Sequence, residues 1–275
     1  MNTKLKQILN VLMWVGILTG IGFTLGFVAE EHANTVYKNI EISITGGDEH
    51  YFIQEEDVKE ILNSKDYKVV GEKIKDVDVA AIERILNDHP SVENADVYAS
   101  IDGTLRIALV QRKPIVRIIN ESGENFYIDE NGSLMPLSDK YTARVLIVNG
   151  RINEPFARWY KHNTNEISTD TLLCDQTMLD DIYSLSTFIL ADPFWKAQIV
   201  QVFINEEGDI ELVPQMGDQR IILGDIKNME EKFNKLLVFY KEGLKKTGWW
   251  NKYESINLKY INQVVCSKKQ QNGNI

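Results

Sequence analysis

The residues that could carry catalysis or bind a metal are dispersed along this chain of 275 residues. Its 4 histidines have neither a second histidine nor a glutamate at the spacing of a zinc site; they are His32, His50, His89 and His162. The sequence contains no Gly-x-Ser-x-Gly turn and no phosphate-binding glycine loop followed by lysine. Adjacent acids such as Asp180 and Asp181 point in different directions from a helix, so they make a poor acid–base pair. The sequence therefore predicts a protein that is not an enzyme and that holds no metal or cofactor.

The 2 cysteines, Cys174 and Cys266, lie far apart in the sequence and match no metal-ligand spacing. A disulfide between them is one interpretation, since oxidation is possible if this region lies outside the cytoplasm. Two free, partly buried thiols are the other interpretation, and the sequence leaves both open.

The composition is that of a globular protein, with 44% apolar and 25% charged residues. A chain of this length can bury one or two well-filled cores. Its formal net charge of −10 disfavours nucleic-acid binding, because that function needs a basic face to neutralise phosphates.

The first segment of the chain is strongly apolar, with no charged residue between Lys6 and Glu30. A helix of that length can cross a bilayer core of about 30 Å. Lys6 and the terminal amine precede the segment while Glu30 and Glu31 follow it, so the positive-inside bias places the N-terminus in the cytoplasm. We therefore expect a cytoplasmic tail at residues 1–7, a transmembrane helix over residues 8–29, and a periplasmic position for the rest. A cleaved signal peptide is the alternative, but no small-x-small cleavage site follows the apolar segment.

A first small domain is expected over residues 36–113, after the apolar segment. Alternating isoleucines predict a half-buried strand at residues 37–46, and two amphipathic segments predict helices at residues 54–63 and 78–89. A hairpin at residues 91–113 completes the unit. Two helices on one face of a small sheet would make a compact α+β domain.

The hairpin is the clearest local pattern. Apolar and polar residues alternate on both of its strands, and Asp102-Gly103 supplies a tight turn in which glycine tolerates the positive φ. Pro114 cannot donate to a strand ladder, so it marks a boundary where the pairing changes.

The second region, residues 114–266, is β-rich. Several apolar runs separated by turn residues predict strands, and helical spacing predicts amphipathic helices at residues 175–191 and 229–240. Residues 255–267 predict one or two terminal strands, and residues 267–275 a disordered tail. The expected fold class is therefore α+β: one N-terminal transmembrane helix, a small β-α-α-β-β domain, and a β-rich domain with two flanking helices.

This layout resembles the FtsQ/DivIB family of bacterial cell-division proteins, whose members carry a POTRA domain and a β domain after one membrane helix. The residues that match the family's POTRA signature are Pro90, Val92, Ala95, Val97, Leu105, Ile107, Leu109, Arg112 and Pro114. Those that match the β domain are Ile128, Asp129 and Gly132, and then Asn257, Leu258, Lys259 and Tyr260, where the family has Asp-Leu-Arg-Tyr. Gln111 replaces a glutamate, and Gln263 stands near the place of a family glycine.

The resemblance implies a non-enzymatic scaffold of the divisome, anchored in the inner membrane at the division septum. It implies that the partners are bitopic coiled-coil proteins of the FtsB/DivIC and FtsL types, and that binding helps to control septal peptidoglycan synthesis. No cofactor and no nucleic acid is implied.

A strand at a sheet edge leaves unpaired N–H and C=O groups on which a partner strand can add. We expect such an edge at residues 258–265, with Tyr260 as an aromatic anchor. The predicted partner-binding residues are Leu258, Lys259, Tyr260, Ile261, Asn262, Gln263, Val264 and Val265. The alternative is that Leu258, Tyr260 and Val264 simply close the core. A second, weaker docking edge is expected on the hairpin at Asn94, Val97 and Ala99.

Two other functions fit parts of the sequence. A POTRA protein of the outer-membrane assembly or secretion type would continue into a long membrane domain of many strands, which about 150 residues with two amphipathic helices cannot supply. A membrane-anchored cell-wall hydrolase would need a clustered nucleophile or metal set, which the sequence does not show.

Overall fold

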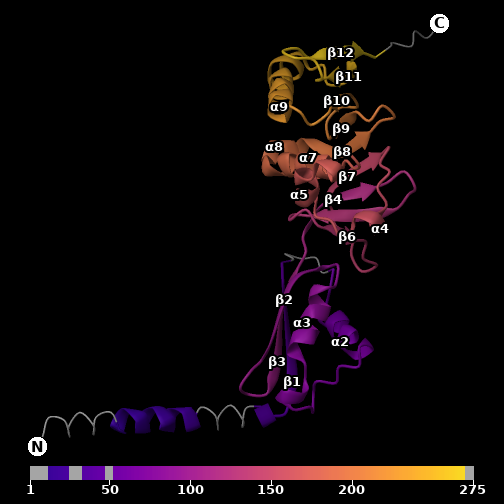
Figure 1. Cartoon of the computed structure of the whole chain (residues 1–275). Coiled ribbons are helices and arrows are strands. Elements are labelled where there is room, and N and C mark those ends of the chain that lie inside the picture. The colour runs from indigo at the N-terminus through magenta and orange to yellow at the C-terminus, as the bar shows by residue number, and fades with distance from the viewer. Residues whose placement is uncertain (1–11, 25–32, 47–51, 270–275) are drawn as a thin grey trace, which may run out of the picture. The chain divides into compact units, whose positions relative to one another are not determined.

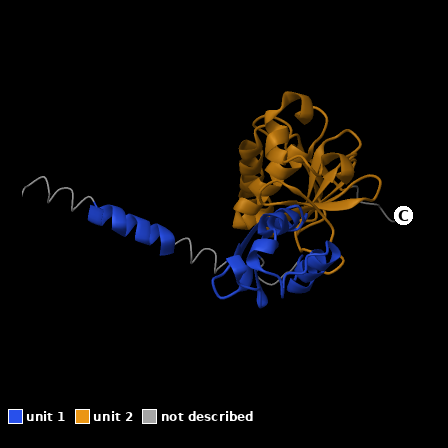
Figure 2. Ribbon diagram, turned by 60° about the horizontal axis from the view of Figure 1, so that its bottom comes forward, with its two compact units in different colours: residues 1–111 blue, residues 112–275 orange. Residues whose placement is uncertain are grey.

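The computed structural model describes residues 12–24, 33–46 and 52–269, and the chain divides into two compact units at residues 111 and 112 (Figures 1 and 2). The first unit holds one small sheet with two helices, and the second holds a large sheet with several helices. The α+β fold class predicted from the sequence is therefore confirmed for these two units.

The membrane helix predicted at residues 8–29 lies partly outside the described residues. Residues 12–24 are helical and exposed. Of the helices in the described ranges, none has both the length and the apolar character needed to cross a bilayer.

The first unit has the strand order β1-β3-β2. Its elements are β1 (Asn39–Thr45), α2 (Glu55–Ser64), a short 3-10 turn (Ile74–Asp76), α3 (Val79–Asn87), β2 (Val92–Ala99) and β3 (Thr104–Gln111). β2 and β3 form the predicted antiparallel hairpin, and β1 pairs in parallel with β3. The core lies between the sheet and the helices, where Val58, Ile82 and Leu86 are fully buried.

Local signals explain why these segments form where they do. Gln54 and Asp57 form a capping box at the start of α2, and the Asp78 carboxylate accepts from the Ala81 N–H at 2.9 Å at the start of α3. Gly103 adopts a φ of +85°, and a Cβ there would lie 2.7 Å from the Val36 carbonyl oxygen. Only glycine fits this hairpin turn, because it must be left-handed and pack closely against the chain entering the unit.

His89, between α3 and β2, is expected to make the first unit less stable in acid. Its Nδ1 accepts from the Ser91 N–H at 3.2 Å, and burial lowers the pKa of His89 below 6.5, partly opposed by the nearby Asp57 carboxylate. The neutral imidazole is therefore favoured in the folded state. Its contribution to stability is present above pH 6.5 and is lost as the pH falls towards the lowered pKa.

We expect β2 amides to exchange hydrogen faster at pH 5.5 than at pH 7.5, after correction for the intrinsic pH dependence. A His89→Gln variant is expected to lose most of this difference, because its side chain does not titrate. An unchanged pH dependence in that variant would show that another group is responsible.

The second unit is built on a nine-stranded sheet with the order β12-β11-β10-β9-β8-β7-β4-β5-β6. The strands are β4 (Pro114–Ile119), β5 (Asn125–Asp129), β6 (Leu134–Pro136), β7 (Leu146–Gly150), β8 (Ile199–Ile204), β9 (Ile210–Pro214), β10 (Arg220–Gly224), β11 (Tyr253–Asn257) and β12 (Val265–Lys268). Hairpins alternate with parallel crossovers, since β4 pairs in parallel with β7, β7 with β8, and β10 with β11.

Helices α7, α8 and α9 lie along one side of this sheet (Figure 1). The two predicted helices are present as α7 (Leu179–Ala191) and α9 (Met229–Val238), and α9 continues through a π-helical segment, η2 (Phe239–Leu244), into α10 (Lys245–Thr247). Four further helices are α4 (Phe156–Trp159), α5 (Thr164–Thr169), α6 (Thr171–Cys174) and α8 (Pro193–Gln198). The prediction of only two flanking helices was wrong in this respect.

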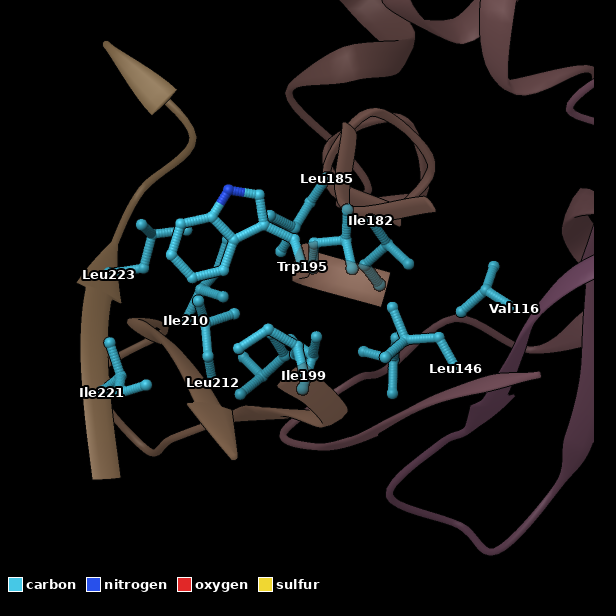
Figure 3. Close-up of a cluster of buried hydrophobic side chains, with 14 of the residues drawn as sticks. Val116, Leu146, Ile182, Leu185, Trp195, Ile199, Ile210, Leu212, Ile221 and Leu223 are labelled. Atoms are coloured by element: carbon cyan, nitrogen blue, oxygen red, sulfur yellow. The ribbon is translucent and has the colours of Figure 1, made fainter. Parts of the chain in front are cut away.

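The main core joins these helices to the sheet. In Figure 3, Ile182 and Leu185 of α7 and Trp195 of α8 lie against side chains of β8, β9 and β10. The residues of these three strands that are labelled there are Ile199, Ile210, Leu212, Ile221 and Leu223, all of them buried. Burying each such side chain contributes roughly 1.5–3 kcal/mol, so this layer holds the far strands of the sheet in place.

A buried ion pair marks the start of the second unit. The Arg112 guanidinium donates to Asp129 Oδ2 at 2.7 Å, and the Asp129 side chain is 1% exposed. Asp129 Oδ1 also accepts from the N–H groups of Asn131 and Ser133. The Arg-x-Pro and Asp-x-x-Gly motifs singled out in the sequence therefore meet in one contact. Gln111 belongs to the other unit, where its side-chain oxygen accepts from the Phe52 N–H at 3.0 Å.

Two terminal strands are present, β11 and β12, which agrees with the prediction of one or two, but the edge predicted at residues 258–265 is placed differently. Residues 258–264 form a connection between β11 and β12, and only Val265 of the predicted partner-binding stretch lies in a strand. The Leu258 N–H still donates to the Ile222 carbonyl of β10, in continuation of the parallel pairing. The Lys259 N–H then donates to the Asn257 side chain at 2.9 Å, and Asn262 takes a left-handed φ of 58°, so the chain turns away from the sheet. The chain then returns antiparallel on the outer side of β11.

Candidate functional site

The C-terminal edge of the large sheet is β12. This strand pairs with β11 on one side and is the last strand in the order, so within the described part of the chain its outer edge has no strand beside it. Cys266 packs against the core, while Val265, Ser267 and Lys268 are exposed. Backbone groups along such an edge can pair with an added strand.

The connection at residues 258–264 is held by α9. The Lys235 ammonium donates to the carbonyl oxygens of Leu258 and Tyr260, at 3.1 and 2.7 Å. On the other side of the connection, the Lys259 ammonium lies 2.5 Å from Asp209 Oδ2, and this hydrogen bond raises the pKa of Lys259. The connection is therefore fixed from two sides, although most of its side chains are exposed.

A Lys235→Met variant tests this anchoring. Loss of hydrogen bonds from a charged donor costs about 1.5 kcal/mol, so we expect the amides of residues 258–264 to exchange about tenfold faster. Lys241→Met is the matched control, because Lys241 is an exposed lysine of the same continuous helix. Equal exchange in the two variants would show that Lys235 does not hold the connection.

The predicted site residues divide into three groups. Leu258 is fully buried and belongs to the core. Tyr260 and Ile261 are exposed beside the Lys235 contact, together with Lys259. Asn262, Gln263 and Val264 line a groove, and Val265 begins β12. The alternative was that Leu258, Tyr260 and Val264 close the core. It describes Leu258 and, in part, Val264, whereas Tyr260 is exposed.

The groove lies between the connection and the α9–η2 helix and has a volume of about 860 Å³. Its helical wall supplies apolar surface from Val238 and Phe239 and the methylene stem of Lys235. The carboxylates of Glu230, Glu231 and Glu242 also line it; Glu242 is paired with Lys246. The groove is thus an apolar trough with an acidic border, open beside the β12 edge.

Sequence reasoning missed the helical wall of this groove. The apolar residues at helical spacing that predict the helix at residues 229–240 are Met229, Phe233, Leu236, Leu237 and Tyr240. They are buried or partly buried in the structure. Val238 and Phe239 fall outside that set, and Val238 is largely exposed. The sequence signal for this wall was the presence of two apolar residues outside the buried face of the helix. The π-helical segment that begins at Phe239 was not readable from the sequence; such segments are frequent at functional sites.

Aromatic side chains extend the apolar surface along the helix and β11. The ring of Tyr253 lies 5.9 Å from that of Phe239 and 6.4 Å from that of Trp249, centroid to centroid. The Lys252 ammonium lies 3.2 Å from the centroid of the half-exposed Trp249 ring. Aromatic rings that are only partly covered are typical anchors of protein interfaces.

The second predicted docking edge, on β2, is already occupied. The Asn87 side chain of α3 bonds both the N–H and the carbonyl of Ala95, at 2.9 and 3.0 Å. The Glu83 carboxylate of the same helix accepts from the Val97 N–H at 3.1 Å. A strand added at Asn94, Val97 and Ala99 would first have to displace these side chains.

Neither the cysteines nor a cluster of metal-binding side chains provides a second candidate site in the described residues. Cys174 and Cys266 are both free thiols, and burial raises the pKa of Cys266. Among the residues that the structure describes, no three His, Cys, Asp or Glu side chains are grouped so that they could hold a metal ion.

A small β-α-α-β-β unit is followed by a β-rich unit whose last described strand lies at a sheet edge. Comparison with known families assigns both units: residues 35–110 match the POTRA-like domain, and residues 113–267 match the family described as FtsQ/DivIB, C-terminal related. The second match covers more than half of the 275 residues, so the chain belongs to the FtsQ/DivIB family. The recognition made from the sequence motifs is confirmed, and the family is generally a non-enzymatic scaffold associated with cell division. No curated protein matches the chain.

Proposed function

We propose that this chain is a divisome scaffold that binds bitopic coiled-coil proteins of the FtsB/DivIC and FtsL types and thereby helps to control septal peptidoglycan synthesis. Membership of the FtsQ/DivIB family supports the association with division. The observation that carries the binding mode is the outer edge of β12, which lies at the end of the sheet order beside an open groove.

A partner segment in extended conformation would add to β12 through backbone hydrogen bonds, and alternate side chains would give specificity. Residues adjoining that added strand would reach the groove between the connection and the α9–η2 helix. The acidic border formed by Glu230 and Glu231 favours a partner with basic residues next to an apolar face. The strand edge would supply affinity, and the groove would select the partner.

The proposed location follows from the first segment. The uncharged stretch between Lys6 and Glu30 would anchor the chain in the inner membrane, with the N-terminus in the cytoplasm and both folded units in the periplasm. A small bitopic partner in the same membrane would then meet the β-rich unit outside the cytoplasm.

Photo-crosslinking in dividing cells tests the proposal. A photoreactive phenylalanine analogue replaces Ser267, which is exposed on β12, in the tagged full-length chain. Ser122 is the matched control position, because it is an exposed serine in the β4–β5 turn, near the other end of the strand order of the same unit. We expect a crosslink to a small coiled-coil membrane protein from position 267 and none from position 122.

Equal crosslinking of that protein from both positions would remove the β12 edge as the binding site. Absence of any division protein from both positions, in cells where the chain is expressed at its normal level, would contradict the proposed function itself.

A further inference from the structure

Three exposed apolar side chains gather at one end of the POTRA-like unit. They are Val36, just before β1, Val70, in the loop after α2, and Ile101, at the tip of the β2–β3 hairpin. Ile101 is 86% exposed, so its side chain makes almost no contact within the described chain. An isolated exposed isoleucine is ordinary, but these three side chains belong to segments that backbone contacts hold at the same end of the unit.

Backbone contacts hold the three segments together. The Lys38 N–H donates to the Gly103 carbonyl at 2.8 Å, which fixes the hairpin tip beside the chain that enters the unit. The Gly71 N–H donates to the Tyr37 carbonyl at 2.9 Å, and Val36 forms an antiparallel bridge with Lys73. We name this surface, made of Val36, Val70 and Ile101, the entry end of the unit. The hairpin tip can approach the chain at Val36 this closely only because residue 103 is glycine, so the fold itself holds these segments together.

The entry end is also where the chain arrives from the apolar N-terminal segment. Residues 25–32 alone separate the helical residues 12–24 from the first residues of this unit, and eight residues span at most about 28 Å. If residues 8–29 cross a bilayer, as the sequence predicts, the entry end is held within that distance of the lipid surface. Figure 1 shows the closed end of the hairpin and the start of β1 at the same end of the unit.

Charge around the surface is nearly balanced. Lys38, Lys68 and Lys73 are exposed near the three apolar side chains, and so are the acids Glu72 and Asp102. In contact with a bilayer, attraction to anionic headgroups would therefore contribute little, and insertion of apolar side chains at the boundary between headgroups and acyl chains would contribute most. Lysines that flank such residues can keep their ammonium groups among the headgroups.

We propose that the entry end is a membrane-contact surface, in which Ile101 at the hairpin tip inserts into the outer leaflet and Val36 and Val70 lie at its boundary. This contact would orient the POTRA-like unit on the bilayer. The proposal rests on the predicted membrane helix and is independent of the β12 edge.

Spin labelling of the full-length chain in nanodiscs of phosphatidylethanolamine and phosphatidylglycerol tests it. Both native cysteines are replaced by serine, and a nitroxide is attached to Ile101→Cys. The matched control is Glu56→Cys, an exposed position in the first turn of α2, at the Phe52–Gln111 end of the unit. Both labels lie on exposed side chains, so neither variant disturbs the core.

We expect the label at position 101 to be more accessible to oxygen than to a water-soluble nickel complex, and the label at position 56 to show the opposite order. A label at position 101 that behaves like the one at position 56 would overturn the proposal. Protection of position 101 from both reagents would also overturn it, because it would show a protein contact in place of lipid. A chain that does not co-elute with the nanodiscs would disprove the membrane helix and the contact together, whereas loss of partner binding would leave both intact.

Discussion

A Val265→Asp variant is expected to bind a strand-adding partner roughly thirtyfold more weakly than the wild type while its β-rich unit stays folded. Val265 is expected to have this effect because it begins the edge strand β12, is 42% exposed and lies next to the groove residue Val264. A buried carboxylate without a partner at the centre of an interface costs about 2 kcal/mol or more, which gives the stated factor. Titration of the full-length chain in detergent with a labelled FtsB/DivIC-type protein measures it.

The matched control is Val200→Asp on β8, since Val200 is 40% exposed but lies away from the sheet edge. Its affinity for the partner is expected to equal that of the wild type. If both variants bind equally well, strand addition at β12 is excluded. If both bind equally weakly, the effect comes from added charge and not from the edge.

The second large effect is expected at the buried ion pair. Asp129→Asn is expected to destabilise the β-rich unit by about 3 kcal/mol, because breaking a buried pair leaves an uncompensated charge. Both carboxylate oxygens are in use: Oδ2 accepts from Arg112, and Oδ1 accepts from the N–H groups of Asn131 and Ser133. In either orientation, the asparagine NH₂ group therefore faces a donor.

Urea unfolding followed by tryptophan fluorescence measures this loss selectively. Of the 5 tryptophans, Trp14 lies in the N-terminal helical segment and the other four lie in the β-rich unit. Glu130→Gln is the control, since its ion pair with Lys113 is at the surface and is worth less than about 1 kcal/mol. A loss for Asp129→Asn no larger than for Glu130→Gln would show that the buried pair does not stabilise the unit.

The hairpin and the small domain around it could be predicted because every local signal agreed. Alternation on both strands, the Asp102-Gly103 turn and the Asp78 cap all point to the same structure. The short helices α4, α5 and α6 could not be predicted, because segments of four to six residues are too short to show a helical period. Asn163 and Asp170 cap α5 and α6, but in the sequence such residues are equally typical of turns.

The terminal edge shows why the candidate site was predicted only in part. Residues 255–267 indicated one or two strands, but the sequence does not reveal that Lys235 donates to two carbonyls of the connection or that Lys259 pairs with Asp209. These contacts join residues that are far apart in the sequence. The edge consequently lies at residues 265–268, and the predicted residues 262–264 line a groove that the sequence did not show.

The side chains of α3 that bond to β2 have a consequence for selectivity. Asn87 and Glu83 occupy the backbone groups of Ala95 and Val97, so any extended peptide that approaches the hairpin competes with groups that belong to the same molecule. An intramolecular competitor is present at a high effective concentration, whatever the amount of peptide outside. The β2 edge of the hairpin is therefore less open to chance pairing with unfolded chains than β12, the edge to which the proposed function assigns partner binding.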